Sequence, residues 1–474
     1  MTDAGGAHGA HGLGANTPML AAAAPPPGDA TPAVVDPAAP SPIGPVSRGY
    51  RRYALLVLLA VYTFNFLDRQ ILAILAEPIK HDLDLKDWQL GLLTGLAFAL
   101  LYTLLGIPIA TWSERGNRPW IIGGAVTIWS GFTALCGAAQ NFVQLVAARV
   151  GVGIGEAGCT PPAMSLITDY TPKEERASAL SIYLLGSPLG ALIGMAAGGL
   201  VADQWGWRSA FLLAGAPGLL LALLVVTTLK EPRRRWSAEI RQRTTQAPGF
   251  AATFAMLRRS RTYWLVVSAV ALKAFISYGT TAFLASFFYR NHAGELSAMA
   301  AAFGLKTGGF LGLALGLVTG VTSGLGTLAG GYVADLFVKR DARAYVLLPV
   351  AGSLTALPFS IVALHSSSVT AALMILAVPS LLNALWLAPS YAAIQGLVPA
   401  SARATATAIL LFVANLIGLG MGPLGVGLIS DLAAASVGPA EGVRTSLTIV
   451  ALLGLPAAAL FWHARRSIVA ETIS

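Results

Sequence analysis

Residues 53–79 read YALLVLLAVYTFNFLDRQILAILAEPI, an apolar run that carries Asp68 and Arg69. The run is long enough to cross the hydrocarbon core of a bilayer, which takes roughly 20 residues of helix. A full charge at the centre of a membrane helix costs roughly 2.5 to 3.5 kcal/mol on insertion scales, so such charges usually face the interior of a helix bundle. The run therefore predicts a membrane helix that contributes to a polar site.

A second run, residues 142–167, reads FVQLVAARVGVGIGEAGCTPPAMSLI and carries Arg149 and Glu156. These two charges lie about two helical turns apart, so their side chains project from one face. The segment Gly153–Gly158 matches the G-x-G-x-x-G fingerprint of dinucleotide sites, but that fingerprint needs a preceding strand and free backbone N–H groups. We interpret the glycines as packing residues around Glu156.

The whole chain has the composition of a polytopic membrane protein. It has 474 residues, of which 55% are hydrophobic and 11% charged, and its mean hydropathy is +0.68. Soluble domains of this length are far more polar. Apolar stretches long enough to span a bilayer recur twelve times. They lie at about residues 50–80, 88–111, 119–139, 142–170, 175–202, 207–229, 262–290, 304–334, 343–364, 369–397, 403–431 and 443–464.

The net charge of +9 reflects topology rather than a nucleic-acid partner. Most of the 31 Lys and Arg residues lie in the N-terminal flank, in the loops after even-numbered spans and in the C-terminal tail. The positive-inside rule then places both termini in the cytoplasm, where basic loops also meet anionic headgroups of membrane lipids.

A basic stretch divides the chain into two sets of spans. We predict two six-helix bundles, residues 48–229 and 262–466, joined by a cytoplasmic linker at 230–261. Residues 1–47 are rich in Ala, Pro and Gly and predict a disordered tail, and residues 467–474 form a C-terminal tail.

The two halves resemble each other. TPKEERA at residues 171–177 reappears as VPASARA at 398–404, an offset of 227 (398 − 171), and Asp203 matches Asp431 one residue further along. Six-helix repeats of this kind occur in transporters, with the substrate site between the halves near the midplane. Glu156 aligns with Asn383. The ionisable chemistry of the predicted site therefore belongs to the N-terminal half.

The six-plus-six pattern, with similar motifs after spans two and eight, resembles the major facilitator superfamily. The motif residues are Ala110, Glu114, Arg115, Asn117 and Arg118 in the first copy, and Gly331, Asp335, Lys339 and Arg340 in the second. The resemblance implies an all-α membrane protein of the major facilitator fold. It also implies that Glu114, Arg115, Arg118, Gly331, Asp335, Lys339 and Arg340 form a cytoplasmic gate.

Further motifs in the first half look like the Spinster family of lipid transporters. They are NFLDRQ at residues 65–70, RVGVGIGEAGCTPPA at 149–163, and WGWR at 205–208, followed by Pro217-Gly218-Leu219. The resemblance implies a proton-coupled transporter of an amphipathic lipid, such as a lysophospholipid or a sphingoid phosphate. We expect a multi-pass protein of the cell membrane, in particular the bacterial inner membrane.

The four charges divide into two chemical roles. An arginine keeps its proton, so we expect Asp68 and Glu156 to carry the coupling protons. Arg69 and Arg149 would pair with these carboxylates or with a phosphate headgroup, because a guanidinium binds both groups in the same bidentate geometry.

Other polar residues within the spans could line the cavity: Lys273, Tyr278, Asn383 and Asn415. The alternative for Lys273 is snorkelling toward the membrane surface, and for the other three it is hydrogen bonding between helices.

Two spans carry a glycine at every fourth position. The ridges are Gly186, Gly190, Gly194 and Gly198 in span five, and Gly308, Gly312, Gly316, Gly320 and Gly324 in span eight. Since spans five and eight face each other in the superfamily, we expect the ridges to form a sliding surface between the halves. Static packing of small residues is the alternative.

Two other functions fit the same charges: transport of a small hydrophilic organic anion or drug, and a receptor that transports nothing. An enzyme is not expected, because the sequence has no Walker motif, metal-ligand cluster or histidine-centred nucleophile. We predict no cofactor besides the coupling protons, no metal and no nucleic acid. The only partners expected are the lipid substrate and membrane lipids, so the protein should be a monomer.

Overall fold

The computed structural model describes residues 47–172, 175–232, 250–338, 341–399 and 402–472. Within these ranges the chain is helical and contains no strand. The predicted N-terminal tail, most of the basic linker, and the last two residues of the predicted C-terminal tail lie outside the described residues.

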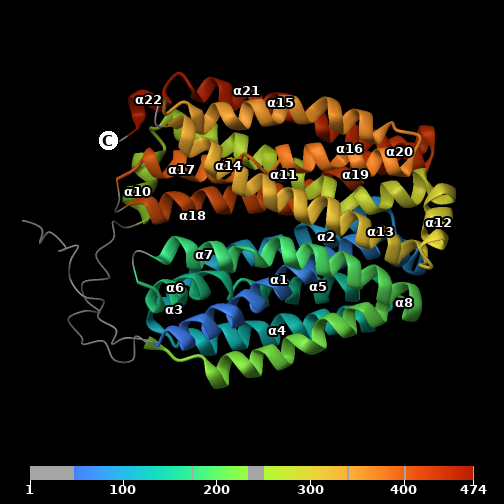
Figure 1. The fold of residues 1–474 in the computed structure, drawn as a ribbon, viewed down its shortest axis with the longest axis horizontal. Helices are drawn as coiled ribbons and strands as arrows, with labels where there is room; N and C mark the ends of the chain where they lie inside the picture. Colours follow the sequence, from blue (N-terminus) through green and yellow to red (C-terminus); the bar gives the residue numbers. More distant parts are fainter. Residues whose placement is uncertain (1–46, 173–174, 233–249, 339–340, 400–401, 473–474) are drawn as a thin grey trace, which may run out of the picture. The chain divides into compact units, whose positions relative to one another are not determined.

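The N-terminal half consists of α1 to α8, and the C-terminal half of α10 to α22 (Figure 1). The first half comprises α1 (Arg48–Leu83), α2 (Asp87–Thr94), α3 (Leu96–Arg115), α4 (Arg118–Ala138), α5 (Phe142–Glu156), α6 (Thr160–Tyr170), α7 (Arg176–Leu184) and α8 (Gly186–Thr228). The second comprises α10 (Phe250–Leu257), α11 (Arg261–Asn291), α12 (Ala293–Ala302), α13 (Thr307–Leu315), η3 (Gly316–Val321), α14 (Thr322–Val338), α15 (Ala344–Leu364), α16 (Val369–Leu382), α17 (Leu387–Gly396), α18 (Arg403–Val413), η5 (Ala414–Met421), α19 (Gly422–Val437), α20 (Pro439–Leu452), α21 (Gly454–Ala464) and α22 (Ile468–Glu471).

The helices of the described residues include eleven candidate membrane spans, and one of these is long enough for two. Eleven helical segments of the described chain are long and apolar enough to cross a membrane, and one of them, Ser178–Thr228, has 51 residues. At 1.5 Å per residue that segment would be about 77 Å long, more than twice the hydrocarbon thickness. Its backbone breaks at Gly206, where φ is +81°. A positive φ suits glycine, so the chain reverses there and the segment forms two spans.

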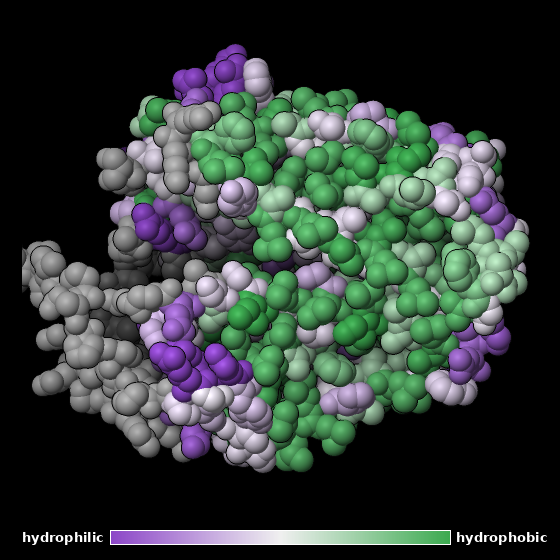
Figure 2. Space-filling view, in the orientation of Figure 1, coloured by the Kyte–Doolittle hydropathy of each residue, from purple (hydrophilic) through white to green (hydrophobic). Residues whose placement is uncertain are grey.

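The surface matches a membrane environment. Leucines such as Leu56, Leu220 and Leu432 are more than 60% exposed. Figure 2 shows hydrophobic residues over most of the visible face, with hydrophilic residues gathered toward its two ends. We call the end where α1 begins and α21 ends the inner end, and the opposite end the outer end. The predicted orientation places the inner end in the cytoplasm.

The glycines of the G-x-G-x-x-G segment pack helices together. A methyl group added at Gly153 would lie 2.4 Å from the carbonyl oxygen of Phe98 in α3, and one at Gly155 would lie 2.5 Å from the backbone nitrogen of Trp129 in α4. Both glycines lie in α5, whose backbone is helical. The arrangement agrees with the packing interpretation.

Gly153→Ala is expected to lower the thermal unfolding temperature in detergent. Overpacking of a close contact typically costs about 1–3 kcal/mol. Gly124→Ala is the matched control, because nothing lies within 4 Å of its added methyl group. That control should be neutral or stabilise by up to about 1 kcal/mol, since alanine favours helix more than glycine does. Equal unfolding temperatures for the two variants would contradict the tight α3–α5 contact.

The prediction that the two glycine ridges face each other is wrong. Methyl groups added at Gly190 and Gly194 would meet the carbonyl oxygens of Thr63 and Leu67, so the ridge of α8 packs against α1 within the N-terminal half. The interface with the C-terminal half uses Pro188, Leu192 and Met195 instead. Pro188 is two residues beyond Gly186 and therefore about 200° further around the helix. The sequence spacing identified a ridge but not its partner.

The glycine ridge of span eight, which runs through α13, η3 and α14, contacts α8. The distance from a methyl group added at each glycine to the nearest α8 atom increases along the ridge. An added methyl group at Gly312 would lie 2.2 Å from the Met195 carbonyl oxygen. At Gly316 the distance to the nearest α8 atom is 3.0 Å, at Gly320 it is 3.2 Å, and at Gly324 it is 3.4 Å. The two helical lines therefore diverge from the outer end toward the inner end.

Candidate functional site

Two helices of the N-terminal half bring the four predicted charges into the protein interior. Asp68 and Arg69 lie in α1, and Arg149 and Glu156 lie in α5. Asp68 and Arg149 are 2% exposed and Glu156 is fully buried. The side chain of Arg69 is 10% exposed, so it is the most accessible of the four.

Arg69 pairs with Glu156. Its Nε and Nη2 atoms lie 2.8 and 2.7 Å from the same carboxylate oxygen, Oε2. The other oxygen, Oε1, has no hydrogen-bond partner among the described residues. The guanidinium carbon lies 5.1, 4.8 and 4.7 Å from the ring centres of Phe66, Phe98 and Tyr102, distances at which aromatic faces attract a cation.

Asp68 has a different environment from Glu156. It accepts a 2.9 Å hydrogen bond from the Thr133 hydroxyl of α4, and it forms no ion pair with any arginine among the described residues. Arg149 donates from Nε to the Leu93 carbonyl oxygen at 3.3 Å. Asp68 can therefore gain or lose a proton without breaking an ion pair, whereas protonation of Glu156 would weaken its pair with Arg69.

Aromatic residues that the sequence analysis missed surround this pair. Tyr102 lies against Arg69, with its ring centre 4.7 Å from the guanidinium carbon, and Tyr278 and Tyr391 belong to the same neighbourhood. The ring of Tyr62 stacks on that of Tyr183 at 4.5 Å. Of these tyrosines only Tyr278 was predicted. In an apolar span a tyrosine looks like an ordinary core residue. Its position in the middle of the span could have marked it as a site residue, because a tyrosine hydroxyl buried there needs a hydrogen-bond partner.

The C-terminal half contains a weaker counterpart of the Arg69–Glu156 pair. Lys273 of α11 is 2% exposed and donates to the Asn383 side-chain oxygen at 2.6 Å. Asn383 is the C-cap of α16, and Glu156 is the last residue of α5. Each half thus pairs a cation from its first long helix, α1 or α11, with a residue at the C-terminal end of a helix in its fourth span, α5 or α16.

Asn415, the remaining predicted lining residue, is half-buried in the π-helical turn η5. Tyr278 is also half-buried, in α11. Their exposure leaves both within reach of a bound molecule, and a role in lining the cavity stays a prediction.

Arg118 is the one charged residue of the predicted cytoplasmic gate whose side chain is described. It is fully buried and contacts Asp169 at 2.6 Å, Ser165 at 3.0 Å and Glu231 through Nε at 3.0 Å. Asp169 and Ser165 belong to the N-terminal half, and Glu231 lies just beyond α8 at the start of the predicted linker. Gly331 lies in α14, where an added methyl group would meet Ala388 at 3.6 Å. The side chains of Glu114, Arg115, Asp335, Lys339 and Arg340 lie outside the described residues, and the gate stays a prediction.

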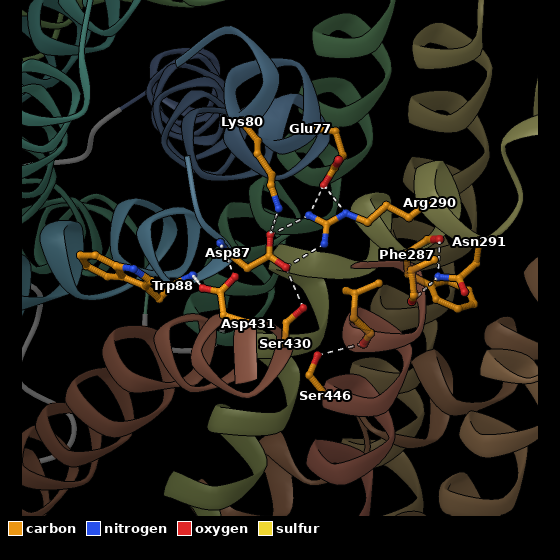
Figure 3. A network of polar contacts seen from close by, with 12 residues as sticks. Glu77, Lys80, Asp87, Trp88, Phe287, Arg290, Asn291, Ser430, Asp431 and Ser446 are labelled. Atoms are coloured by element: carbon orange, nitrogen blue, oxygen red, sulfur yellow. Dashed lines mark hydrogen bonds and ion pairs between the residues drawn. The ribbon is translucent and has the colours of Figure 1, made fainter. Parts of the chain in front are cut away.

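A second polar cluster, absent from the sequence analysis, joins the two halves at the outer end (Figure 3). Arg290 of α11 binds both carboxylate oxygens of Asp87 at 2.7 Å and also binds Glu77 at 2.8 Å. Ser430 of α19 donates to Asp87 at 2.7 Å, and Lys80 pairs with the same carboxylate. Asp87 is 1% exposed. These charges lie near span ends, where sequence alone suggests ordinary interfacial residues.

Comparison with known proteins gives consistent matches. The family model described as Major Facilitator Superfamily matches residues 58–423. An MFS-type efflux pump of Mycolicibacterium smegmatis is 34% identical over 426 residues, which are 88% of this chain and 94% of that protein. Protein spinster homolog 1 of Rattus norvegicus is 26% identical over 88% of this chain and 81% of its own length.

A solved structure shares both sequence and fold with the chain. It is the crystal structure of a bacterial homolog to the human lysosomal transporter Spinster, in an inward-facing and unoccupied conformation. The sequence identity is 32% and the TM-score is 0.80, with 90% of this chain and all of that chain covered.

Proposed function

The chain belongs to the major facilitator superfamily, and we propose that it is a proton-coupled transporter of an amphipathic lipid that works by alternating access. Members of this superfamily are membrane transporters, so the protein is not an enzyme. The proposed substrate is a lysophospholipid or a sphingoid phosphate, and the proposed location is the bacterial inner membrane.

The observation that carries the proposal is the Arg69–Glu156 pair beside Asp68, which forms no ion pair with an arginine in the part of the chain that the structure describes. A phosphate headgroup competes with Glu156 for the Arg69 guanidinium, because both anions fit the same donor geometry. A proton on Glu156 removes this competitor and leaves Arg69 free for the headgroup. A proton on Asp68 changes the buried charge without breaking an ion pair. Proton binding and headgroup binding are thereby coupled.

The surroundings of Arg69 favour an amphipathic substrate over a hydrophilic one. Phe66, Phe98 and Tyr102 form an apolar wall around the guanidinium. Leucines on α8 and α14 are exposed on the apolar surface of the protein, among them Leu189 and Leu325. An acyl chain that packed against such side chains would gain roughly 0.8 kcal/mol per buried CH₂ group. The likeness to Spinster proteins supports the same substrate class.

A second candidate is transport of a small hydrophilic organic anion or drug. It is favoured by the likeness to the protein named as an efflux pump, with which the chain shares 34% identity. Both candidates use the same charges, and they differ in whether the substrate has a phosphate headgroup and a long chain.

Counterflow in proteoliposomes separates the candidates. Liposomes preloaded with unlabelled substrate should take up labelled lysophospholipid or sphingoid phosphate, and a labelled hydrophilic organic anion should not enter. Arg69→Lys should weaken headgroup binding about tenfold or more, because lysine lacks the bidentate fork. Arg208→Lys, at a half-exposed outer-end arginine, is the matched control and should behave as the parent. Uptake of the hydrophilic anion without lipid uptake would overturn the lipid assignment, and flux of no probe would favour a receptor.

A further inference from the structure

Two carboxylates at the outer end each cap a helix of the opposite half. Asp203 of α8 accepts hydrogen bonds from the backbone N–H groups of Gly308 and Gly309 in the first turn of α13, at 3.2 and 2.5 Å. Asp431 of α19 accepts from the N–H groups of Asp87 and Trp88 in the first turn of α2, at 3.1 and 2.8 Å (Figure 3). Each carboxylate therefore satisfies two N–H groups that have no partner within their own helix.

The internal repeat builds the two contacts in the same way. Asp203 and Asp431 are 228 positions apart (431 − 203), and so are Gly199 and Gly427. A methyl group added at Gly199 would lie 2.1 Å from the Gly308 carbonyl oxygen, and one at Gly427 would lie 2.3 Å from the Asp87 carbonyl oxygen. In both copies the glycine allows the backbones to touch, and the aspartate one turn later reaches the facing helix.

Neither capped helix has an N-cap side chain that accepts from the N–H groups of its first turn. In α2 the Gln89 side chain accepts from the backbone N–H of Lys86 at 2.8 Å, and the N–H groups of Asp87 and Trp88 bind Asp431. The N-cap residues are Lys86 for α2 and Lys306 for α13, and the structure assigns neither a side-chain capping hydrogen bond. A lysine ammonium group has only donors, so it cannot accept from a helix N–H. The preferred N-caps Ser, Thr, Asp and Asn are absent from both positions. The missing acceptor comes from the other half of the protein in each case.

We propose that Asp203 and Asp431 are paired latches that hold the outer end closed by capping the first turns of α13 and α2. The proposal rests on the alternating-access part of the proposed function. Separation of the halves at the outer end would withdraw both carboxylates together and expose four N–H groups and two helix dipoles without their counter-charge. Closure restores all of these contacts. The latches therefore bias the molecule toward the state in which the cavity faces the inner end.

The packing near each latch supports this role. The contact between α8 and the α13–α14 line is tightest toward Asp203: a methyl group added at Gly312 would lie 2.2 Å from the nearest α8 atom, and one added at Gly324 would lie 3.4 Å away. Near Asp431, Arg290 adds an ion pair between the halves through Asp87. Both copies of the repeat contain the capping contact, whereas the Arg290–Asp87 ion pair belongs to the contact at Asp431.

The test measures how often the outer end opens. Met195 of α8 is 2% exposed and its sulfur faces Thr319 of the other half at 3.9 Å, so a cysteine at this position reports on the interface. In a Met195→Cys variant that also carries Cys136→Ala and Cys159→Ala, the probe is a membrane-impermeant maleimide added from the outer side. The rate at which the maleimide reacts with the cysteine is proportional to the fraction of molecules whose outer end is open, even where that fraction is small.

Asp203→Ala and Asp431→Ala should each accelerate labelling about five-fold, the ratio that corresponds to loss of a typical N-cap. The double variant should react roughly 25-fold faster, since the two sites are separate and their effects should multiply. Asp203→Asn should recover part of the slow rate, because the single asparagine oxygen can still accept from one helix N–H group but the second acceptor and the negative charge are lost.

Asp82→Ala is the matched control. Asp82 is an outer-end carboxylate whose partners, Arg208 and Trp207, lie in its own half, so its loss should leave labelling unchanged. A double latch variant that stays folded by size-exclusion chromatography and labels at the parental rate would overturn the proposal. Because the probe needs no substrate, this result is independent of whether the cargo is a lipid.

Discussion

Asp68→Asn is expected to abolish proton-driven accumulation of substrate and to leave counterflow close to the parental rate. Asparagine has nearly the shape of aspartate and can still accept the hydrogen bond from Thr133, but it cannot carry a proton. Asp68 forms no ion pair with a described arginine, so its neutralisation leaves no buried cation without a partner. The Arg69–Glu156 pair stays in place. Substrate exchange should therefore continue while the coupling to the proton gradient is lost.

The measurement compares two assays on one proteoliposome preparation, uptake driven by an imposed pH gradient and counterflow without a gradient. Asp82→Asn, at a carboxylate that is 43% exposed, removes one negative charge elsewhere and should affect neither assay. Parental accumulation by Asp68→Asn would exclude Asp68 as the proton carrier and leave Glu156 as the remaining candidate. Loss of both assays would point to a role in substrate binding instead.

Arg118→Met is expected to give the largest loss of stability, about 3–5 kcal/mol in the free energy of unfolding. Arg118 is fully buried and its guanidinium contacts the carboxylates of Glu231 and Asp169. Methionine fills a similar volume, but it removes the Arg118 guanidinium from its contacts with both carboxylates. The contacts also tie the start of α4 to α6 and to the end of α8, so their loss should loosen the inner end of the N-terminal half.

Thermal unfolding in detergent measures this effect. Arg208→Met is the matched control, because the side chains of Arg208 and Asp82 are 39% and 43% exposed. An exposed ion pair contributes at most about 1 kcal/mol. Similar unfolding temperatures for the two variants would contradict the strong stabilising role of the buried cluster.

The predicted fold agrees with the structure because span prediction depends on local properties. Transfer of a 20-residue apolar segment into lipid is favourable whatever its neighbours are, so the twelve spans and the two halves can be identified from composition and length. A list of helices alone does not separate the two spans that meet at Gly206. Helical geometry runs almost continuously from Ser178 to Thr228, and the two spans are separated by a single residue with positive φ.

The structure brings the four predicted charges into the interior of the N-terminal half, and their role as a transport site stays a prediction. The positions of Asp68, Arg69, Arg149 and Glu156 within apolar runs predicted a shared polar interior, but not the pairing of the charges. Asp68 and Arg69 are adjacent, so their side chains leave α1 about 100° apart and meet different helices. Asp68 meets Thr133 of α4, and Arg69 meets Glu156 of α5.

The sequence by itself determined the class of the protein, its internal repeat and the charges within its spans, because these follow from local hydrophobicity and from similarity along the chain. Only the tertiary structure decided which face of each glycine ridge meets which helix, which arginine binds Glu156, and that Asp203 and Asp431 cap helices of the opposite half. Those partners are far apart in the chain: Arg69 and Glu156 are separated by 87 positions, and Asp87 and Asp431 by 344. Contacts over such separations depend on how the helices rotate and pack, and no local pattern encodes that geometry.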